Sequence, residues 1–570
     1  MKTKKTDVMK RFQLFTALLT LAANMALGAS VESIFAPVVV GVPPSDAYIG
    51  LAKMESGELR HYNYGEQKRD EAPFYISSWD KGLTWKRVNL TSDLVYADQK
   101  SPASGEYIRV YALNRKVYSV RTRGGIDGGR DIGVVDEEQS IMVKPPIFIR
   151  GGERVVVGAH RADRTGSHSY FSDDDGLTWK RSNLVATPLH EPNEYDKSYR
   201  WNHGAVEPTI IELNDGRLWM IIRTSQDRHY QSFSDDGGES WCEATPSPFY
   251  GTITMPTLQR LSDGRILFLW CNTTPLPETE GNNGRWEDVF TNRSAIHAAI
   301  SEDDGKTWIG MRELYLDSGR NDADFATKEG RDKSVHQAQC VELGNDKILV
   351  AFGQHEVHRK MVIFDTKWLY ETERTTDFSN GLEEFTAFQY IKGIKGHCGY
   401  NRVECDVLRD HSEGNSDNIS KNRSNKMITL GYTPIDSLVS DRVGVVWNFP
   451  AARNGSVKVR AKLPQGSQSI KLILNDRWFN ATDDVAEHKS IYAVELSRKT
   501  LAIRDDKWHT IEVRWAANGA AQLYVDSKRR ATLPLKNSSE HGVSYIHLLG
   551  GTTPDPVGVS VDRIEATAIN

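Results

Sequence analysis

The stretch "SDDDGLTW" (Ser172–Trp179) places three aspartates, a glycine and a tryptophan in a short run. The same frame recurs in "SSWDKGLTW" (Ser77–Trp85), "SDDGGESW" (Ser234–Trp241) and "SEDDGKTW" (Ser301–Trp308). Only Ser, Asp, Gly, a Thr or Ser, and Trp keep fixed positions in all copies. A helix-loop-helix calcium loop would need its first acidic ligand where Phe171 stands. We therefore interpret the acidic residues as structural.

The shared pattern predicts a tight turn between two strands. The Ser hydroxyl and the Asp carboxylate can bond to backbone amides across the turn, and the Gly can adopt positive φ. The Trp can then anchor the loop between sheets. A unit that recurs every ~60 residues is typical of a propeller or array, in which each sheet packs on its neighbours.

Apolar hairpins recur through the same region. They are "DAYIGLAKMESGELRHY", "PPIFIRGGERVVVGAHR", "EPTIIELNDGRLWMIIR", "MPTLQRLSDGRILFLW" and "AQCVELGNDKILVAFG". Each joins two strands through a polar turn. We expect five blades from these hairpins and a sixth that combines strands from both ends of the region and closes the ring. The segment "EYIRVYALNRKVYSVRTRGG" complicates this count.

The pattern changes near Thr375, where the turns described above stop. Beyond it, "SVKVRAKL", "SIKLILND", "HTIEVRWA" and "AQLYVDS" alternate apolar and polar residues as half-buried strands do. The predicted fold is all-β: a six-bladed β-propeller over 30–374, followed by a lectin-like, jelly-roll β-sandwich over 375–570.

Composition and the N-terminus limit the partners. The chain has 570 residues, a formal net charge of -5 and scattered basic residues, so we expect no nucleic-acid partner. Residues 1–29 combine a basic head, a short apolar core and a small-residue ending, the pattern of a cleaved export signal. No later segment is long and apolar enough to span a membrane. We expect a secreted or periplasmic protein.

The cysteines do not form a scaffold. There are five, an odd number, without a C-x-x-C pair for zinc. Cys398 and Cys405 are close enough in sequence to form a local bridge, which we keep as an alternative to free thiols.

The four turns, the hairpins and the export signal together resemble the sialidase (neuraminidase) superfamily, whose six-bladed propellers carry such turns, called Asp-boxes or BNR repeats. The resemblance covers Ser45 to Trp368. It implies that the Asp-boxes lie on the face away from the active site, and that neither metal nor organic cofactor is required. The stretch "DKWHTIEVRWAANGAAQLYVDS" (Asp506–Ser527) resembles the strand pair of concanavalin-like or laminin-G-like sandwiches, which often bind glycans.

The family's chemistry implies roles for particular residues. Three arginines bind the substrate carboxylate, a Glu activates a nucleophilic Tyr, and an Asp is the general acid. Glu207 matches the Glu and Arg223 the second arginine, with a rim salt bridge as the alternative. Arg293 matches the third arginine, or is a solvated strand-edge residue. Asp70 matches the acid, although Glu71 beside it fits nearly as well and a solvated charge run is the alternative.

The sequence departs from the family pattern at two places. Residues 46–50 contain no arginine where the first one is expected, and the position of the tyrosine is best matched by His336. A histidine there can act as a base, or it can be a hydrogen-bonded residue at a strand end. His203, four residues before Glu207, can share the same rim and contact substrate.

These observations favour an exported, sialidase-like exo-glycosidase that removes an acidic sugar, such as a sialic, ulosonic or uronic acid, from a glycan. One alternative is a lyase or dehydratase acting on uronate polymers, with a histidine as the base. The other is a non-catalytic propeller that only binds glycans.

Overall fold

The structure is a computed structural model of the full chain. It describes residues 30–569 except 45–48, 64–73, 92–93, 129, 196–199, 201–203, 252, 275–292, 324–334, 355–357, 395–399, 412–424, 433–441, 518 and 552. The predicted export signal, residues 1–29, lies outside the described residues.

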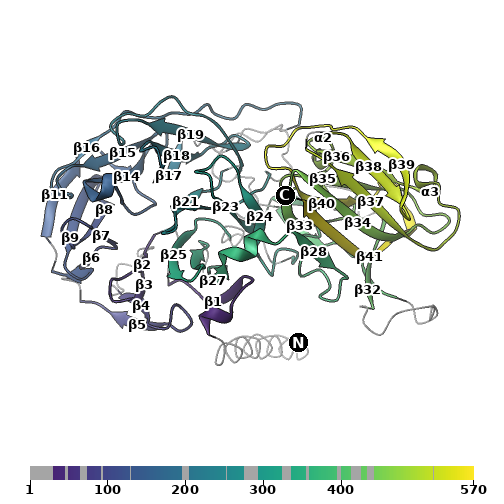
Figure 1. The fold of residues 1–570 in the computed structure, drawn as a ribbon, viewed down its shortest axis with the longest axis horizontal. Coiled ribbons are helices and arrows are strands. Elements are labelled where there is room, and N and C mark those ends of the chain that lie inside the picture. The colour runs from purple at the N-terminus through teal and green to yellow at the C-terminus, as the bar shows by residue number, and fades with distance from the viewer. Residues whose placement is uncertain are drawn as a thin grey trace.

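Within these described residues, the first part of the chain forms six antiparallel sheets, the blades (Figure 1). Blade one holds β2 (Leu51–Lys53), β3 (Leu59–Tyr62), β4 (Phe74–Ser78) and β5 (Lys86–Asn89). Blade two holds β7 (Gln99–Lys100), β8 (Tyr107–Leu113), β9 (Lys116–Thr122) and β11 (Arg130–Asp136). Blade three holds β12 (Ser140–Ile141), β13 (Ile147–Ile149), β14 (Arg154–Arg161), β15 (Ser167–Ser172) and β16 (Lys180–Arg181).

The other three blades follow in chain order. Blade four holds β17 (Val206–Glu212), β18 (Leu218–Arg223), β19 (Arg228–Ser234) and β20 (Thr245–Tyr250). Blade five holds β21 (Thr257–Arg260), β22 (Ile266–Trp270), β23 (Ala295–Ser301) and β24 (Ile309–Leu316). Blade six holds β25 (Gln339–Gly344), β26 (Lys347–Phe352), β27 (Lys360–Asp365) and β1 (Val38–Gly41). Short elements flank the blades: η1 (Val31–Ser33), β6 (Val95–Tyr96), β10 (Ile126–Asp127), η2 (Arg150–Gly152) and η4 (Thr366–Tyr370).

Strand β1 closes the ring, because it pairs antiparallel with β27 at the other end of the region. The sequence prediction of a blade built from both ends is therefore confirmed, but the predicted count needs a correction. The blade that β1 completes is the one containing the "AQCVELGNDKILVAFG" hairpin, and "EYIRVYALNRKVYSVRTRGG" supplies β8 and β9 of a separate blade. Neither of these two hairpins is followed by an Asp-box, so the Asp-boxes do not indicate which of them shares a blade with β1.

A hydrophobic cluster fills each contact between successive blades, including the contact between the last and the first. In order around the ring, the clusters contain Tyr62 with Tyr107, Val110 with Tyr170, Val156 with Met220, Trp219 with Phe268, Leu267 with Val350, and Leu349 with Leu59. Since no blade can bury both faces alone, this closed sequence of contacts holds the blades together.

The Asp-boxes connect the last two strands of blades one, three, four and five. In blade four, Asp236 accepts hydrogen bonds from the Ser234 hydroxyl at 2.8 Å and from the Ser240 amide at 2.9 Å. The indole of Trp241 donates to the Ser169 hydroxyl of blade three at 2.9 Å. The predicted structural role of these turns is confirmed.

The second part of the chain forms two packed sheets, as the sandwich prediction requires (Figure 1). One sheet contains β28 (Glu373–Thr376), β31 (Leu408–Asp410), β32 (Lys426–Tyr432), β34 (Asn454–Lys462), β37 (Trp508–Trp515), β38 (Ala521–Val525), β39 (Lys528–Leu533) and β41 (Asp555–Ile569). The other contains β33 (Gly444–Ala452), β35 (Ile470–Asn475), β36 (Tyr492–Leu496) and β40 (Val543–Leu549). Also present are a separate hairpin, β29 (Phe388–Ile394) with β30 (Tyr400–Glu404), and two short helices, α2 (Val485–His488) and α3 (Arg498–Leu501).

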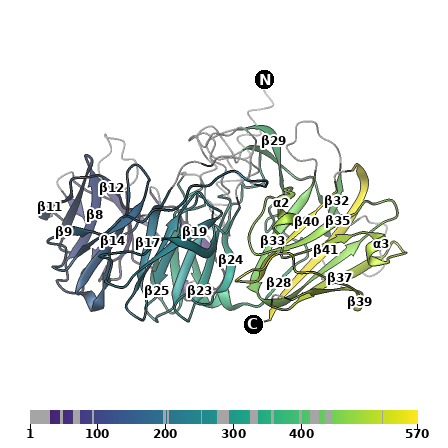
Figure 2. The ribbon, with the colours of Figure 1, turned by 90° about the horizontal axis from the view of Figure 1, so that it is seen from above.

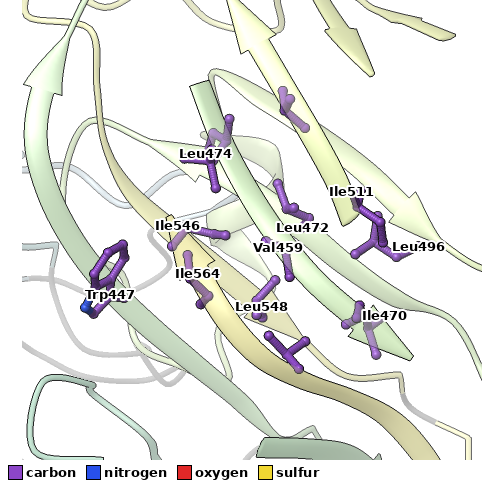
Figure 3. Packing of buried hydrophobic residues seen from close by; sticks show 14 of the residues in the cluster. Trp447, Val459, Ile470, Leu472, Leu474, Leu496, Ile511, Ile546, Leu548 and Ile564 are labelled. Atoms are coloured by element: carbon purple, nitrogen blue, oxygen red, sulfur yellow. The ribbon is translucent and has the colours of Figure 1, made fainter. Parts of the chain in front are cut away.

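Alternating apolar residues from the two sheets form the core of the sandwich. Figure 3 shows Leu472 and Leu548 from one sheet near Val459 and Ile564 from the other. The expected strands "HTIEVRWA" and "AQLYVDS" are β37 and β38, paired antiparallel. The likeness of this sandwich to lectins, and the exact domain limits, stay predictions.

The propeller and the sandwich are joined by buried hydrogen bonds and lie side by side (Figure 2). The Asn272 amide donates to the backbone carbonyl of Asp476 at 2.9 Å, and the Tyr545 hydroxyl donates to Glu313 at 2.8 Å. His297 contacts the same Tyr545 hydroxyl at 2.5 Å. Blade five therefore carries much of this joint.

Two further predictions concern membrane-spanning segments and a disulfide bridge. Among the described residues, no helix has the length and apolar character needed to cross a membrane. Cys398 lies outside the described residues, so the predicted bridge to Cys405 stays a prediction; the Cys405 thiol itself is buried.

Candidate active site at the mouth of the ring

Strand register places the Asp-boxes and the predicted site residues at opposite ends of the blades. In blade four, Leu218 pairs with the Asp-box residue Ser234, whereas Arg223 at the other end of β18 pairs with Val206. In blade five, Ile266 pairs with the Asp-box residue Ser301. We call the end opposite the Asp-boxes the mouth.

A β-bulge brings Glu207 and Arg223 together. Val206 pairs with Arg223 and Thr209 with Ile221, so β17 carries one extra residue, and Glu207 there has a φ of 51°. Such a bulge re-aims a side chain. The Arg223 Nη1 donates to the Glu207 Oε2 at 2.7 Å, and both side chains are largely buried. The rim pairing expected from the hairpin is present.

The Glu207 carboxyl is held ionised. Burial raises its pKa, but the charges of Arg223 and Arg293 and the hydrogen bond from Arg223 outweigh that effect and lower the pKa below its ordinary value. A carboxylate in this state can accept a proton from water, whereas it cannot donate one at neutral pH.

Arg293 reaches the same site from blade five. It lies two residues before β23, at the mouth, and its Nη1 donates to the Gln354 Oε1 at 3.2 Å. Its Nη2 donates to the carbonyl of Ile253 at 3.2 Å, and the Ile253 amide donates to the carbonyl of Thr224, next to Arg223. Both predicted arginines are therefore fixed to one framework.

His336 belongs to this framework too. It is 1% exposed, and its Nε2 lies 2.8 Å from the Gln354 Oε1. Because an amide oxygen only accepts hydrogen bonds, the Nε2 must carry the hydrogen. His336 thus supports Gln354 beneath Arg293, which fits the alternative of a hydrogen-bonded residue at a strand end. Its predicted role as a base stays a prediction.

Two residues that sequence reasoning missed contact Glu207 from other blades. The Glu207 amide donates to the His160 Nδ1 at 3.2 Å, and the Gln337 Nε2 approaches the Glu207 Oε1 at 3.5 Å. Burial lowers the pKa of His160 to about 4, so this ring is neutral at pH 7 and able to accept. The one sequence signal was that Gln337 adjoins His336.

Two cations were also missed. Arg164, in the turn after β14, interacts electrostatically with Glu207 and Arg223. Lys144 donates to the Thr257 hydroxyl at 2.7 Å and to the Ala338 carbonyl at 2.5 Å. Burial lowers the pKa of Lys144 to about 7. Around the Glu207 carboxylate, cations therefore outnumber anions among these described side chains.

Backbone strain gathers at the mouth. Glu207 has a φ of 51°, Ile253 of 50°, Gln337 of 61° and Arg164 of 63°. Residues other than glycine rarely adopt this region, and a β-branched residue does so at particular cost. Strain of this kind persists where the surrounding structure fixes it, often at functional sites.

A channel of about 650 Å³ opens between the inner strands of the blades. Its lining includes Lys144, Asp98, Pro208 and Gln339, which come from four different blades. Glu207, Arg223, Arg293 and His336 do not line this channel, which extends to Arg260 at the Asp-box end of blade five.

Several predicted positions fall outside the described residues. They are Asp70, Glu71, His203 and residues 46–48 of the segment expected to carry the first arginine. Across the part of the chain that the structure describes, no cluster of His, Cys, Asp and Glu side chains could hold a metal ion.

Comparison with known proteins bears mainly on the repeats. Residues 138–350 match the model of the BNR repeat-like domain, and no curated protein matches the chain. A protein of unknown function from Dyadobacter fermentans is 15% identical, with 58% of this chain and 97% of that chain covered and a TM-score of 0.37.

Two sialidase structures are also similar. The Trypanosoma rangeli sialidase in complex with sialic acid is 13% identical, with 96% of both chains covered and a TM-score of 0.35. The NanB sialidase from Streptococcus pneumoniae is 12% identical, with 58% of this chain and 71% of that chain covered and a TM-score of 0.37. At these values the likenesses carry no conclusion about the reaction of this chain. The family match confirms the predicted resemblance to the Asp-box propellers: residues 138–350 carry a BNR repeat-like domain.

Proposed function

We propose that the protein is an exported glycoside hydrolase that removes an acidic sugar from the end of a glycan. The observation that supports this best is the pair of buried guanidinium groups, Arg223 and Arg293, beside the carboxylate of Glu207. Two buried like charges are costly, and an anionic ligand relieves that cost. A sugar carboxylate matches the planar, bidentate geometry of arginine.

In the proposed reaction, Glu207 is the base. Arg223 donates to Glu207 at 2.7 Å, and the substrate carboxylate binds against Arg223 and Arg293. Water attacks the anomeric carbon, Glu207 takes the proton of that water, and the bond to the leaving oxygen breaks. The acid, assigned to Asp70, gives its proton to the leaving oxygen.

Direct attack by water is proposed because the position that the family resemblance assigns to the tyrosine is best matched by His336. The Gln337 amide can orient Glu207 but cannot form the covalent intermediate. Export remains part of the proposal and rests on residues 1–29.

The test is incubation of the full chain with a panel of sialic-acid-ended and uronate-ended oligosaccharides. Hydrolysis releases a free acidic sugar with a new reducing end, and the Glu207→Gln variant should abolish that release. Formation of an ultraviolet-absorbing unsaturated uronide would show that the reaction is elimination instead of hydrolysis. Retention of these glycans by the wild type without any product would make the protein a binding module.

A further inference from the structure

A second cavity, which we call the junction pocket, lies between blade four and the sandwich. Its volume is about 460 Å³, and its walls include Asp227, Arg228 and Tyr250 of blade four and Arg477 and Lys489 of the sandwich. A volume of this size suits a small organic ligand. None of the residues assigned to the mouth lines it.

The junction pocket has aromatic walls. The Tyr250 ring lies between two guanidinium groups, with the Arg228 Cζ 4.1 Å and the Arg477 Cζ 3.5 Å from its centroid. The Arg228 Nη2 also donates to the Tyr250 hydroxyl at 2.6 Å, which fixes this ring. Tyr230 adds a second, half-buried ring to the lining. Such rings offer an apolar face with a polar edge.

Both carboxylates in the lining of the junction pocket are already paired with cations. Asp227 contacts Arg200 at 2.9 Å and Lys489 at 3.2 Å, and Arg477 contacts Asp476 at 2.6 Å. Burial raises the pKa of Asp227, but Arg200, Lys489 and Arg477 lower it well below its ordinary value. Donors and acceptors are therefore plentiful, and the three cations of the lining, Arg228, Arg477 and Lys489, exceed its two carboxylates, Asp227 and Asp476, by only one. This combination favours an uncharged ligand rich in hydroxyl groups.

The junction pocket is next to the mouth in structure as well as in sequence. Asp227 follows Arg223 by four residues, and the carbonyl of Asp227 accepts from the Gly251 amide at 3.0 Å. The adjoining Ile253 holds Arg293. Arg223 ends the second strand of blade four, whereas Arg228 begins the third and pairs with Tyr250 of the fourth, so the pocket lies roughly 10 Å farther out.

We propose that the junction pocket binds an uncharged sugar unit of the glycan whose acidic end occupies the mouth. This assignment rests on the proposed function for the continuity of the two sites, although binding of uncharged sugar in the pocket can be measured without it. The sandwich then forms one wall of a binding site, with Arg477 and Lys489 as its contribution.

The experiment measures saturation-transfer NMR on the full chain with neutral tri- to hexasaccharides built from galactose, glucose, mannose, fucose and N-acetylhexosamines. The wild type should give a signal with at least one of them. Ser538→Trp, at an exposed position of the lining, should fill the pocket and remove that signal, and Tyr230→Ala should weaken it about tenfold or more. Tyr118→Ala, at a half-buried tyrosine stacked on Tyr111 in blade two, is the matched control and should keep it.

Absence of a signal from every neutral oligosaccharide with wild type, or a signal that Ser538→Trp leaves unchanged, would overturn the assignment. If the mouth does hydrolyse acid-ended glycans, Ser538→Trp should raise KM for an acid-ended tetrasaccharide and leave kcat and the KM for an aryl glycoside of the acidic sugar unchanged. If acid-ended glycans are not turned over at all, the proposed function fails. Binding of the neutral oligosaccharide then still tests the assignment of the junction pocket as a site for uncharged sugar.

Discussion

Two acidic residues of blade four, Asp236 at the Asp-box end and Glu207 at the mouth, have different surroundings. At the Asp-box end, the Asp236 carboxylate accepts from groups within four residues of it, between Ser234 and Ser240. At the mouth, Glu207 is contacted by His160 of blade three, Arg223 of its own blade and Gln337 of blade six.

The difference separates a structural acid from a candidate functional one. The hydrogen bonds of the Asp236 carboxylate come from its own turn, and the same local chemistry recurs in three other blades. Glu207 is buried on strained backbone and is surrounded by cations from several blades. An arrangement of that kind reduces the stability of the folded chain, and such arrangements cluster at sites where a ligand binds or a reaction takes place.

The largest expected effect is that of Glu207→Gln. Removing the proposed base should lower kcat on acid-ended glycans by about 10²–10⁴-fold. The control is Glu212→Gln at the Asp-box end of the same strand, which should keep full activity because the Glu212 carboxylate accepts from the Arg150 amide, away from the mouth. Equal activity of the two variants in initial-rate assays would remove Glu207 from the reaction.

Acidification should affect the mouth before the Asp-boxes. Burial lowers the pKa of His61 and His160 to about 4 and that of His229 and His297 to about 3, and all four lie toward the mouth ends of their strands. The unfolded chain binds protons near pH 6.5 while the folded chain does not, so stability falls as pH drops from 6.5 toward 4.

Thermal unfolding between pH 7 and pH 4 checks this expectation. We expect a loss of a few kcal/mol over that range. The carboxyl of Asp236 has its pKa lowered to about 2 by hydrogen bonds from Ser240 and Ser234, which outweigh burial, so its contribution is lost only at more acidic pH. A melting temperature that stays constant down to pH 4 would contradict the assigned neutral histidines.

Arg293→Lys should weaken the capture of acidic sugars. Loss of one bidentate, charge-assisted contact corresponds to about 1.5–3 kcal/mol, or a rise in KM of about 10- to 100-fold. Arg265→Lys is the control, because Arg265 lies at the Asp-box end of the same blade and pairs with Asp263 and Asp346. Calorimetric titration with the acidic monosaccharide should show unchanged affinity for the control alone.

The smallest effect is expected at the Asp-box itself. Asp236→Ala removes the acceptor of several turn hydrogen bonds and should lower the free energy of unfolding by about 1–2 kcal/mol. The specific activity of the folded fraction should not change. Chemical denaturation and initial rates measured on the same preparation test both parts, and a loss of activity without a loss of stability would reverse the interpretation of this face.

Local chemistry explains which features the sequence could predict. The Asp-boxes, and the pairing of Glu207 with Arg223 across one hairpin, depend on residues close in the chain, and both were predicted. Arg293 was found from its place before an Asp-box. By contrast, His160, Arg164 and Gln337 reach Glu207 from other blades, and no spacing within one chain segment reveals that approach.

The blade order was predicted only in part for the same reason. Alternating apolar and polar residues indicate each hairpin. The partner of β1 depends instead on ring closure, because β27 lies more than three hundred residues later in the chain. The junction pocket was not predicted at all. Its two sides come from β19 and β20 and from the sandwich, and their meeting depends on the joint made by Asn272, Glu313 and Tyr545.

The most direct test of the account is a crystal structure of the Glu207→Gln variant with an acid-ended trisaccharide. The account predicts that the carboxylate of the terminal sugar contacts both Arg223 and Arg293, with its anomeric carbon facing residue 207. A trisaccharide bound at the Asp-box face, or a mouth left empty at a saturating concentration of the trisaccharide, would contradict it.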